Sequence, residues 1–163
     1  MLEQRVQNPA LKPLQGVGVV AAVLAAAALG SAAFSRLAVR VSSVASIGFI
    51  VYGMAIAGFL IRRYVLAYRY QAGPDCLHID RLYGRYARAM TDVWYGSVSA
   101  WGTPEDVRAK HPSAPVSRAV CARCGLAPFA MAHQSGGRTV ITVIQPDDSV
   151  RQRLEKAFRG AKN

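Results

Sequence analysis

Two cysteines three positions apart, Cys121 and Cys124, form the one pair in this sequence whose spacing suits a metal or redox site. Two thiolates at this spacing can supply half of a tetrahedral zinc site. The sequence has no second such pair, and only His111, His133 or Cys76 could complete the set through the fold. The pair also does not open a helix after a strand, as thioredoxin-like motifs do. We therefore expect ordinary thiols in or beside a strand and no cofactor, with zinc binding and redox exchange as the alternatives.

Three arginines surround a short turn that also carries aromatic residues. They are Arg81, Arg85 and Arg88, and the aromatic neighbours are Tyr83, Tyr86 and, further along, Trp94. Guanidinium groups gathered at a hairpin tip can bind phosphate through two parallel hydrogen bonds. The pattern predicts an anion or lipid-headgroup site, and the alternative interpretation is a solvated strand face.

Other chemistry finds no support in the residue pattern. The sequence lacks a nucleophile beside a base at motif spacing, a pair of catalytic carboxylates and a phosphate-binding loop. The segment Ser135-Gly136-Gly137 is typical of a turn, and the three histidines are isolated from any Ser or Asp at motif spacing. His78 alternates outward on its strand and is expected to be exposed. We expect a protein that is not an enzyme.

Two long apolar runs precede all of these candidate residues in the sequence and would determine where in the cell they lie. The runs extend from Gly16 to Phe34 and from Val44 to Ile61, and neither contains a charged residue. At ~1.5 Å per residue each is about as long as the ~30 Å hydrocarbon core of a bilayer. They predict a transmembrane helical hairpin over residues 16–66, after a cytoplasmic segment over residues 1–15. A transporter core is not expected, because ion pathways usually need an ionisable residue within the membrane.

The cations that flank the runs predict the orientation of the hairpin. Arg36 and Arg40 lie between the runs, whereas five cations lie outside them: Arg5, Lys12, Arg62, Arg63 and Arg69. The positive-inside rule then places both ends in the cytoplasm. A cleaved signal peptide ending at Ala33 is the alternative, although the second run starts too soon after it to fit well. We expect Arg62, Arg63 and Tyr64 to anchor the second helix at the interface.

Both apolar runs carry small residues at four-residue spacing, which lets helix backbones approach closely in lipid. In the first run these are Gly18, Ala22, Ala26 and Gly30, and in the second they are Gly53 and Ala57. Packing of the two helices on each other explains this pattern, and formation of a homo-oligomer is the alternative.

Residues 67–163 suffice for one small domain, and the cysteines there would be free thiols in a reducing compartment. The net charge of +11 is spread along the chain rather than gathered in an arm, so we expect an anionic bilayer rather than nucleic acid as its partner. Short alternating stretches broken by Gly and Pro predict six or seven antiparallel strands. The expected strands include 77–83, 86–94, 95–101, 118–124, 129–134 and 138–145, with a loop and short helix over 103–116.

An amphipathic helix over residues 147–160 ends the predicted domain. Asp147 and Asp148 lie at its positive end, and an apolar face formed by Val150, Leu154 and Phe158 predicts that it packs on the sheet. The strand over 138–145 has no polar face, so we expect it to be covered on both sides. These elements describe a small, mostly β domain closed by a helix.

The order of these pieces resembles the bacterial pleckstrin-homology-like domains that follow membrane hairpins. The pieces are the Tyr68-x-Tyr70 strand, the Asp75–Arg81 strand, the Tyr83–Arg88 hairpin, and the closing strand with Pro146 and its helix. The resemblance covers about residues 64–160 and implies a partly open barrel capped by a helix. It also implies a non-catalytic platform that binds lipid or protein. The alternatives are an accessory subunit of a larger membrane complex and a zinc or redox module.

Overall fold

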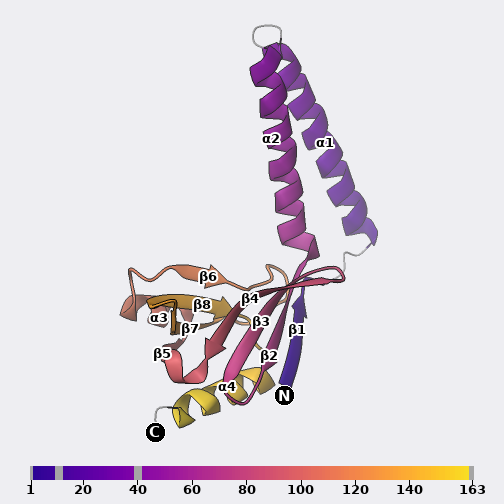
Figure 1. Cartoon of the computed structure of the whole chain (residues 1–163). Helices are drawn as coiled ribbons and strands as arrows, with labels where there is room; N and C mark the ends of the chain where they lie inside the picture. Colours follow the sequence, from indigo (N-terminus) through magenta and orange to yellow (C-terminus); the bar gives the residue numbers. More distant parts are fainter. Residues whose placement is uncertain (1, 10–12, 39–41, 162–163) are drawn as a thin grey trace. The chain divides into compact units, whose positions relative to one another are not determined.

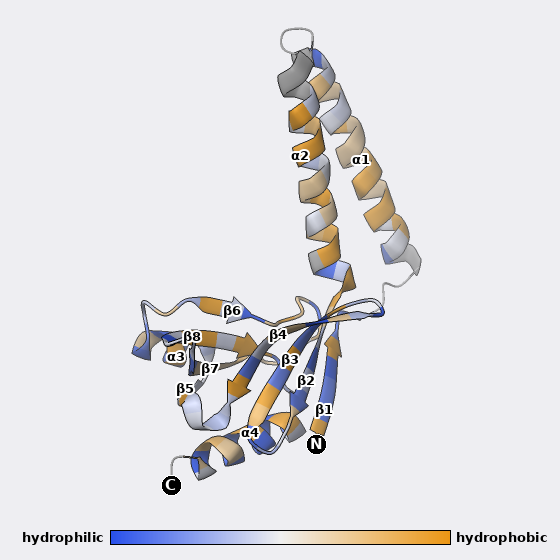
Figure 2. Ribbon diagram, viewed as in Figure 1, coloured by the Kyte–Doolittle hydropathy of each residue, from blue (hydrophilic) through white to orange (hydrophobic). Residues whose placement is uncertain are grey.

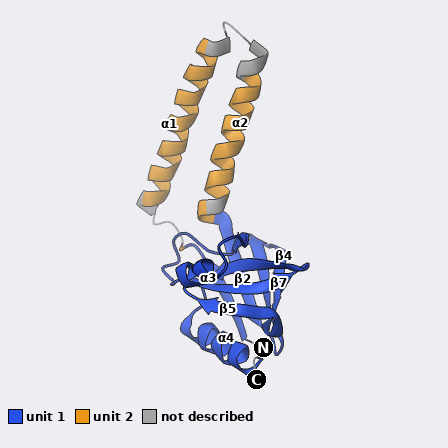
Figure 3. Ribbon diagram, turned by 90° about the vertical axis from the view of Figure 1, so that its left-hand side faces the viewer, with its two compact units in different colours: residues 1–8, 65–163 blue, residues 9–64 orange. Residues whose placement is uncertain are grey.

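The computed structural model describes residues 2–9, 13–38 and 42–161 as a mixed helix-plus-β chain (Figure 1). Two units divide the chain, one formed by residues 1–8 and 65–163 and the other by residues 9–64 (Figure 3). Lys12 and Arg40, two of the cations used to predict orientation, lie outside the described residues. The unit of residues 9–64 is an insertion between two segments of the other unit.

Two helices, α1 (Pro13–Ala38) and α2 (Ser42–Leu60), make up most of residues 9–64, and a π-helical turn, Ile61–Val65, follows α2. Among the described residues, these are the helices whose length and composition would allow them to cross a membrane. Figure 2 shows apolar residues around both helices. In the two candidate spans only 6% and 0% of the residues are buried, so these apolar surfaces are not the core of a folded domain.

Aromatic side chains lock the two helices together near their connected ends. A Cβ atom on Gly30 would clash with the Tyr52 ring, and a Cβ atom on Gly48 would lie 2.6 Å from the Phe34 ring. Each helix therefore offers a glycine to an aromatic residue of the other. The Tyr52 hydroxyl also donates to the Ala26 carbonyl at 2.8 Å. This accounts for the small residue at Gly30 by packing within the hairpin, whereas Gly53 and Ala57 are exposed.

The other unit contains two four-stranded sheets, with strand orders β1-β2-β3-β4 and β5-β7-β8-β6. The strands of the first sheet are β1 (Leu2–Gln7), β2 (Leu66–Ala72), β3 (Cys76–Tyr83) and β4 (Tyr86–Trp94). Those of the second are β5 (Val98–Gly102), β6 (Val116–Arg118), β7 (Phe129–Ser135) and β8 (Arg138–Ile144). A 3₁₀ turn, Tyr95–Ser97, joins β4 to β5.

The sequence predicts only a cytoplasmic segment over residues 1–15, whereas in the structure residues 2–7 form strand β1. In the structure this strand pairs with β2 in an antiparallel register from Leu2↔Ala72 to Gln7↔Ala67. The reason is visible in its alternation, since Gln4 and Val6 point into the domain while their neighbours are exposed. The helical hairpin is thus inserted between two paired strands.

The predicted strand over 118–124 is wrong. Strand β6 covers only Val116–Arg118, and it pairs with β8 in parallel rather than antiparallel. After Ala119 the chain leaves the sheet, because the Cys121 N–H donates to the Gln145 side chain at 2.7 Å and Gly125 turns with φ +74°. Among the described residues, the predicted domain contributes seven strands, β2 to β8, which agrees with the expected six or seven, and β1 adds an eighth from outside it.

One core lies between the sheets and is closed by helix α4 (Asp148–Gly160). Tyr70 and Leu77 from one sheet and Phe129 and Met131 from the other are each at most 2% exposed, and α4 adds the predicted Val150, Leu154 and Phe158. A second, smaller core lies where helix α3 (Pro104–Lys110) places Val107 on the other face of the second sheet. Strand β8 is consequently covered on both faces, as predicted.

Candidate functional site

Strands β1 and β2 are fastened together at the point where the chain leaves for the helices and returns. The Cys121 thiol lies 3.5 Å from the Val6 carbonyl oxygen and 3.6 Å from that of Leu66. Asn8 donates from Nδ2 to the Leu66 carbonyl at 3.4 Å and accepts from the Arg123 N–H at 2.9 Å. We call these residues the clamp. Directly opposed residues of paired strands have Cα atoms about 5 Å apart, so the two ends of the inserted segment are held side by side.

The contacts of the clamp account for the position of the Cys121 thiol without a bound metal ion. The Cys121 side chain is 2% exposed, and burial, with a smaller contribution from nearby Cys124, raises the pKa of the thiol to about 11. A thiol with so high a pKa is a poor nucleophile without a base beside it, because the thiolate is the attacking species. Within the described residues no group of three or more His, Cys, Asp or Glu side chains could hold a metal ion. Of the proposed additional ligands, His133 bonds Thr142 and Cys76 lies beside His78.

The arginines at the hairpin tip come together in part. Arg81 and Arg88 are direct partners across β3 and β4, so their side chains leave the same face of the sheet. Arg85 lies in the turn between the strands, after Gly84, whose φ of +60° suits the first position of a type II′ turn. Like charges placed directly opposite each other repel, and an anion between them would remove that repulsion.

Arg81 is half-buried on the face that Tyr68 and Tyr83 share. Hydrogen bonds to the Tyr83 and Tyr68 hydroxyls raise the pKa of the guanidinium despite some loss of solvation, so it remains charged. One terminal nitrogen lies 3.9 Å from the Met90 sulfur. The Nε atom is buried and has no hydrogen-bond partner among the described residues. A guanidinium fixed in this way is ready to bind an anion at its remaining donors.

Two tyrosines complete this end of the sheet, but Trp94 does not. Tyr83 and Tyr86 are cross-strand partners, 38% and 82% exposed. Trp94 lies at the opposite end of β4, as the partner of Cys76. Tyr83 is also in register with Leu66, the first residue of β2. The basic and aromatic tip, which we define as Arg81, Tyr83, Arg85, Tyr86 and Arg88, is therefore at the end of the sheet where β2 begins.

The predicted interface anchors lie in the π-helical turn after α2. Arg62, Arg63 and Tyr64 are consecutive there. The Arg63 guanidinium carbon is 6.0 Å from the ring centres of Phe59 and Tyr64, within the range of cation–π contacts. A basic group that stacks on aromatic rings at the end of an apolar helix suits an interfacial role.

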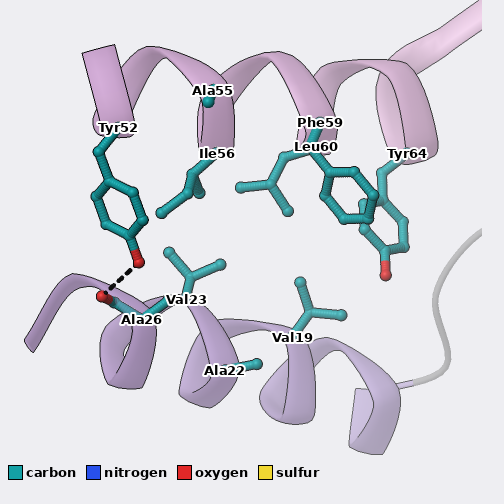
Figure 4. Close-up of a pocket in the computed structure, with 10 residues that line it drawn as sticks. All are labelled: Val19, Ala22, Val23, Ala26, Tyr52, Ala55, Ile56, Phe59, Leu60 and Tyr64. Atoms are coloured by element: carbon teal, nitrogen blue, oxygen red, sulfur yellow. Dashed lines mark hydrogen bonds between the residues drawn. The ribbon is translucent and has the colours of Figure 1, made fainter. Parts of the chain in front are cut away.

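An apolar slot of about 420 Å³ opens between α1 and α2, towards the ends that are not connected (Figure 4). Val19 and Val23 of α1 point towards Ile56 and Leu60 of α2, and Phe59 and Tyr64 lie side by side at one end. The remaining lining residues are Ala22, Ala26, Tyr52 and Ala55. The slot was not foreseen from the sequence, because it depends on how far the helices separate.

A second contact group that sequence reasoning missed lies on the outer face of the first sheet. The Cys76 sulfur is 3.1 Å from His78 Nε2, and His78 Nδ1 is 2.7 Å from an Asp92 carboxylate oxygen. The sequence alone makes His78 look isolated, because residue spacing does not show strand register. In the structure His78 and Asp92 are direct partners across β3 and β4.

Comparisons of the chain with protein-family models, curated proteins and solved structures found no significant match. The structure defines the class only as a mixed helix-plus-β chain with two four-stranded sheets and a C-terminal helix.

Proposed function

We propose that this chain is a non-catalytic, membrane-anchored binding module of the bacterial inner membrane, with both termini in the cytoplasm. Its two-sheet domain, of the pleckstrin-homology-like kind, would hold the basic and aromatic tip against an anionic membrane surface. One observation carries the proposal: the apolar hairpin is inserted between two strands that the clamp holds together.

The insertion of the hairpin between two paired strands supports a topology with both chain ends on one side of the membrane, and this argument does not use the charge pattern. Gln7 and Ala67 are partners in one sheet, so the chain must depart from and return to the same place. Two apolar helices between these points form an out-and-back path, which crosses a bilayer twice and leaves both ends on one side. Exposed helices with apolar residues all round need such a medium to cover them.

The tip supplies the binding surface. Cations near an anionic membrane contribute about 1 kcal/mol each, so its three arginines would contribute about 3 kcal/mol, or roughly 100-fold in affinity. Tyrosine side chains suit the headgroup region, because each has an apolar ring and a polar end. Strand register places Tyr83 at the level of Leu66, which follows the hairpin almost directly.

The test uses the full chain in lipid nanodiscs, with Tyr86→Trp as a fluorescent reporter and lipids that carry a quencher on the headgroup. We expect more quenching of this reporter in anionic than in neutral discs. Changing Arg81, Arg85 and Arg88 together to Gln should remove the difference. The matched control changes three exposed arginines elsewhere to Gln, Arg108, Arg118 and Arg138, and should keep it. Equal quenching in both kinds of disc, or equal effects of the two triple variants, would contradict the proposal.

The slot between α1 and α2 favours a second candidate, an accessory subunit of a larger membrane complex. An apolar slot with exposed helix faces beside it could receive a helix of another membrane protein. Purification of the full chain in mild detergent separates the two candidates. A stoichiometric membrane-protein partner, lost when Val23 and Ile56 are both changed to Trp to fill the slot, would favour the accessory subunit.

A further inference from the structure

Cys76, His78 and Asp92 form a relay in the order thiol, imidazole, carboxylate. Cys76 and His78 are two residues apart on β3, so their side chains share the outer face of the sheet. Asp92 reaches the imidazole from the partner strand β4. The two contacts, 3.1 Å and 2.7 Å, use opposite nitrogens of the ring. A nucleophile bonded to a base that a third group orients is the arrangement that activates thiols and hydroxyls.

The carboxylate determines which nitrogen is the base. A carboxylate can only accept, so Nδ1 carries the proton that it donates to Asp92 when the imidazole is neutral. The lone pair of Nε2 then faces the Cys76 sulfur, and the thiol can donate its proton there. Burial, and next the nearby Asp92 and Asp75 charges, raise the pKa of the Cys76 thiol. The thiol is therefore protonated at neutral pH and needs a base at the moment it reacts.

Two other carboxylates near the relay, Glu3 and Asp80, each have a partner of their own. Gln71 of β2 lies opposite His78 and donates to Glu3 of β1 at 3.0 Å. Asp80, the next residue on the same face of β3, is held by Arg69 at 2.6 Å. The side chains of His78 and Asp92 are 41% and 56% exposed, whereas Cys76 is 7% exposed, so solvent reaches the imidazole and the carboxylate more readily than the sulfur. Trp94, the cross-strand partner of Cys76, borders the thiol and is 59% exposed.

We propose that Cys76 is an acyl-acceptor site that takes an acyl group from a thioester, with His78 as the general base and Asp92 as a positioning residue. In this step the Cys76 sulfur bonds to the thioester carbonyl carbon, and its proton moves to His78 Nε2. The carbon–sulfur bond of the donor then breaks, and the departing thiolate takes the proton from Nε2. The products are S-acyl-Cys76 and a free thiol, with no change in oxidation state.

Thioesters are the expected acyl donors because their leaving group is a thiolate. Exchange of an acyl group between two thiols breaks one carbon–sulfur bond and forms another, so it needs no oxidant and its leaving group is a thiolate. An amide has a much poorer leaving group and requires dedicated stabilisation of the oxyanion. The step is a single modification of the chain rather than a turnover, and it is independent of the proposed membrane function.

The experiment treats the full chain in detergent with the acetyl thioester of N-acetylcysteamine and follows each of its three cysteines by peptide mass spectrometry. Cys124, which is half-buried, reports intrinsic thiol reactivity. Cys121 is 2% exposed and its thiol contacts the Val6 and Leu66 carbonyls, so it reports that the domain stays folded. We expect Cys76 to be acetylated faster than Cys124, with Cys121 protected. His78→Ala should slow Cys76 by roughly 100-fold, the lower end of general-base contributions, and leave Cys124 unchanged.

Two further variants separate base catalysis from structure. Added imidazole should restore part of the Cys76 rate in His78→Ala, because a free base can occupy the vacated space. Asp92→Asn should slow Cys76, whereas Asp92→Glu should retain most of the rate. The proposal is overturned if Cys76 reacts no faster than Cys124. It is equally overturned if His78→Ala leaves the Cys76 rate unchanged while Cys121 stays protected.

Discussion

Val6 offers the sharpest test of the inserted-hairpin architecture, because it lies on the strand that precedes the helices. Its side chain is 2% exposed in the main core. Val6→Ala removes two methyl groups, worth about 1.6 kcal/mol of transfer free energy at ~0.8 kcal/mol each. The cavity left behind raises the expected loss in free energy of unfolding to about 2–3 kcal/mol. For a domain of this size that lowers the unfolding midpoint by roughly 8–20 °C.

Thermal unfolding of the full chain in detergent, followed by tryptophan fluorescence, measures this effect. Both tryptophans lie in the two-sheet unit, and Trp101 packs on Phe158 of α4 with ring centres 5.3 Å apart. The signal therefore reports this core. Arg5→Ala is the matched control, since Arg5 is on the exposed face of the same strand and its loss should change stability by less than about 0.5 kcal/mol. An unchanged midpoint in Val6→Ala would refute the reasoning, because β1 would then not be part of the domain.

Three further predictions concern stability of the same unit. Burial lowers the pKa of His133, so the unfolded chain binds more protons and stability should fall as pH drops below about 6.5. Urea titrations at several pH values should show a smaller fall in His133→Gln than in the unchanged chain, and an equal fall would contradict this role of His133. Asp147 accepts from the Val150 N–H at 2.8 Å at the start of α4, so Asp147→Ala should lower the free energy of unfolding by about 1 kcal/mol in the same titrations, and no loss would contradict this capping role. Gly84 has φ +60°, so Gly84→Ala should destabilise by about 1–2 kcal/mol, and an unchanged unfolding midpoint would argue against this turn.

Local patterns predicted the elements whose partners lie nearby in sequence. The helix at the C-terminus has an N-cap and a continuous apolar face. The Gly136-Gly137 turn between β7 and β8 has φ of +56° and +77°, and a type I′ turn requires positive φ at both central residues. The lack of a polar face in strand β8 predicted that both of its faces are covered. These features depend on neighbouring residues, which a single sequence displays.

Features that depend on distant partners were missed. Strand β1 is six residues long and finds its partner only after the whole helical hairpin, so its alternation alone was too short to identify it. The spacing of Cys121 and Cys124 predicts ordinary thiols with zinc binding as an alternative, but it does not show that the fold directs the Cys121 thiol to the carbonyls of Val6 and Leu66. The contact of His78 with Asp92 follows from strand register, which the spacing of the two residues does not specify.

Protease protection of the two chain ends tests the central claim most directly. Epitope tags placed before residue 1 and after residue 163 can be digested in sealed right-side-out and in inverted inner-membrane vesicles. The account predicts that both tags are removed in inverted vesicles and that both are protected in right-side-out vesicles, with the chain retained in the membrane after carbonate washing. Removal of the two tags from opposite sides, or release of the chain by carbonate, would contradict it.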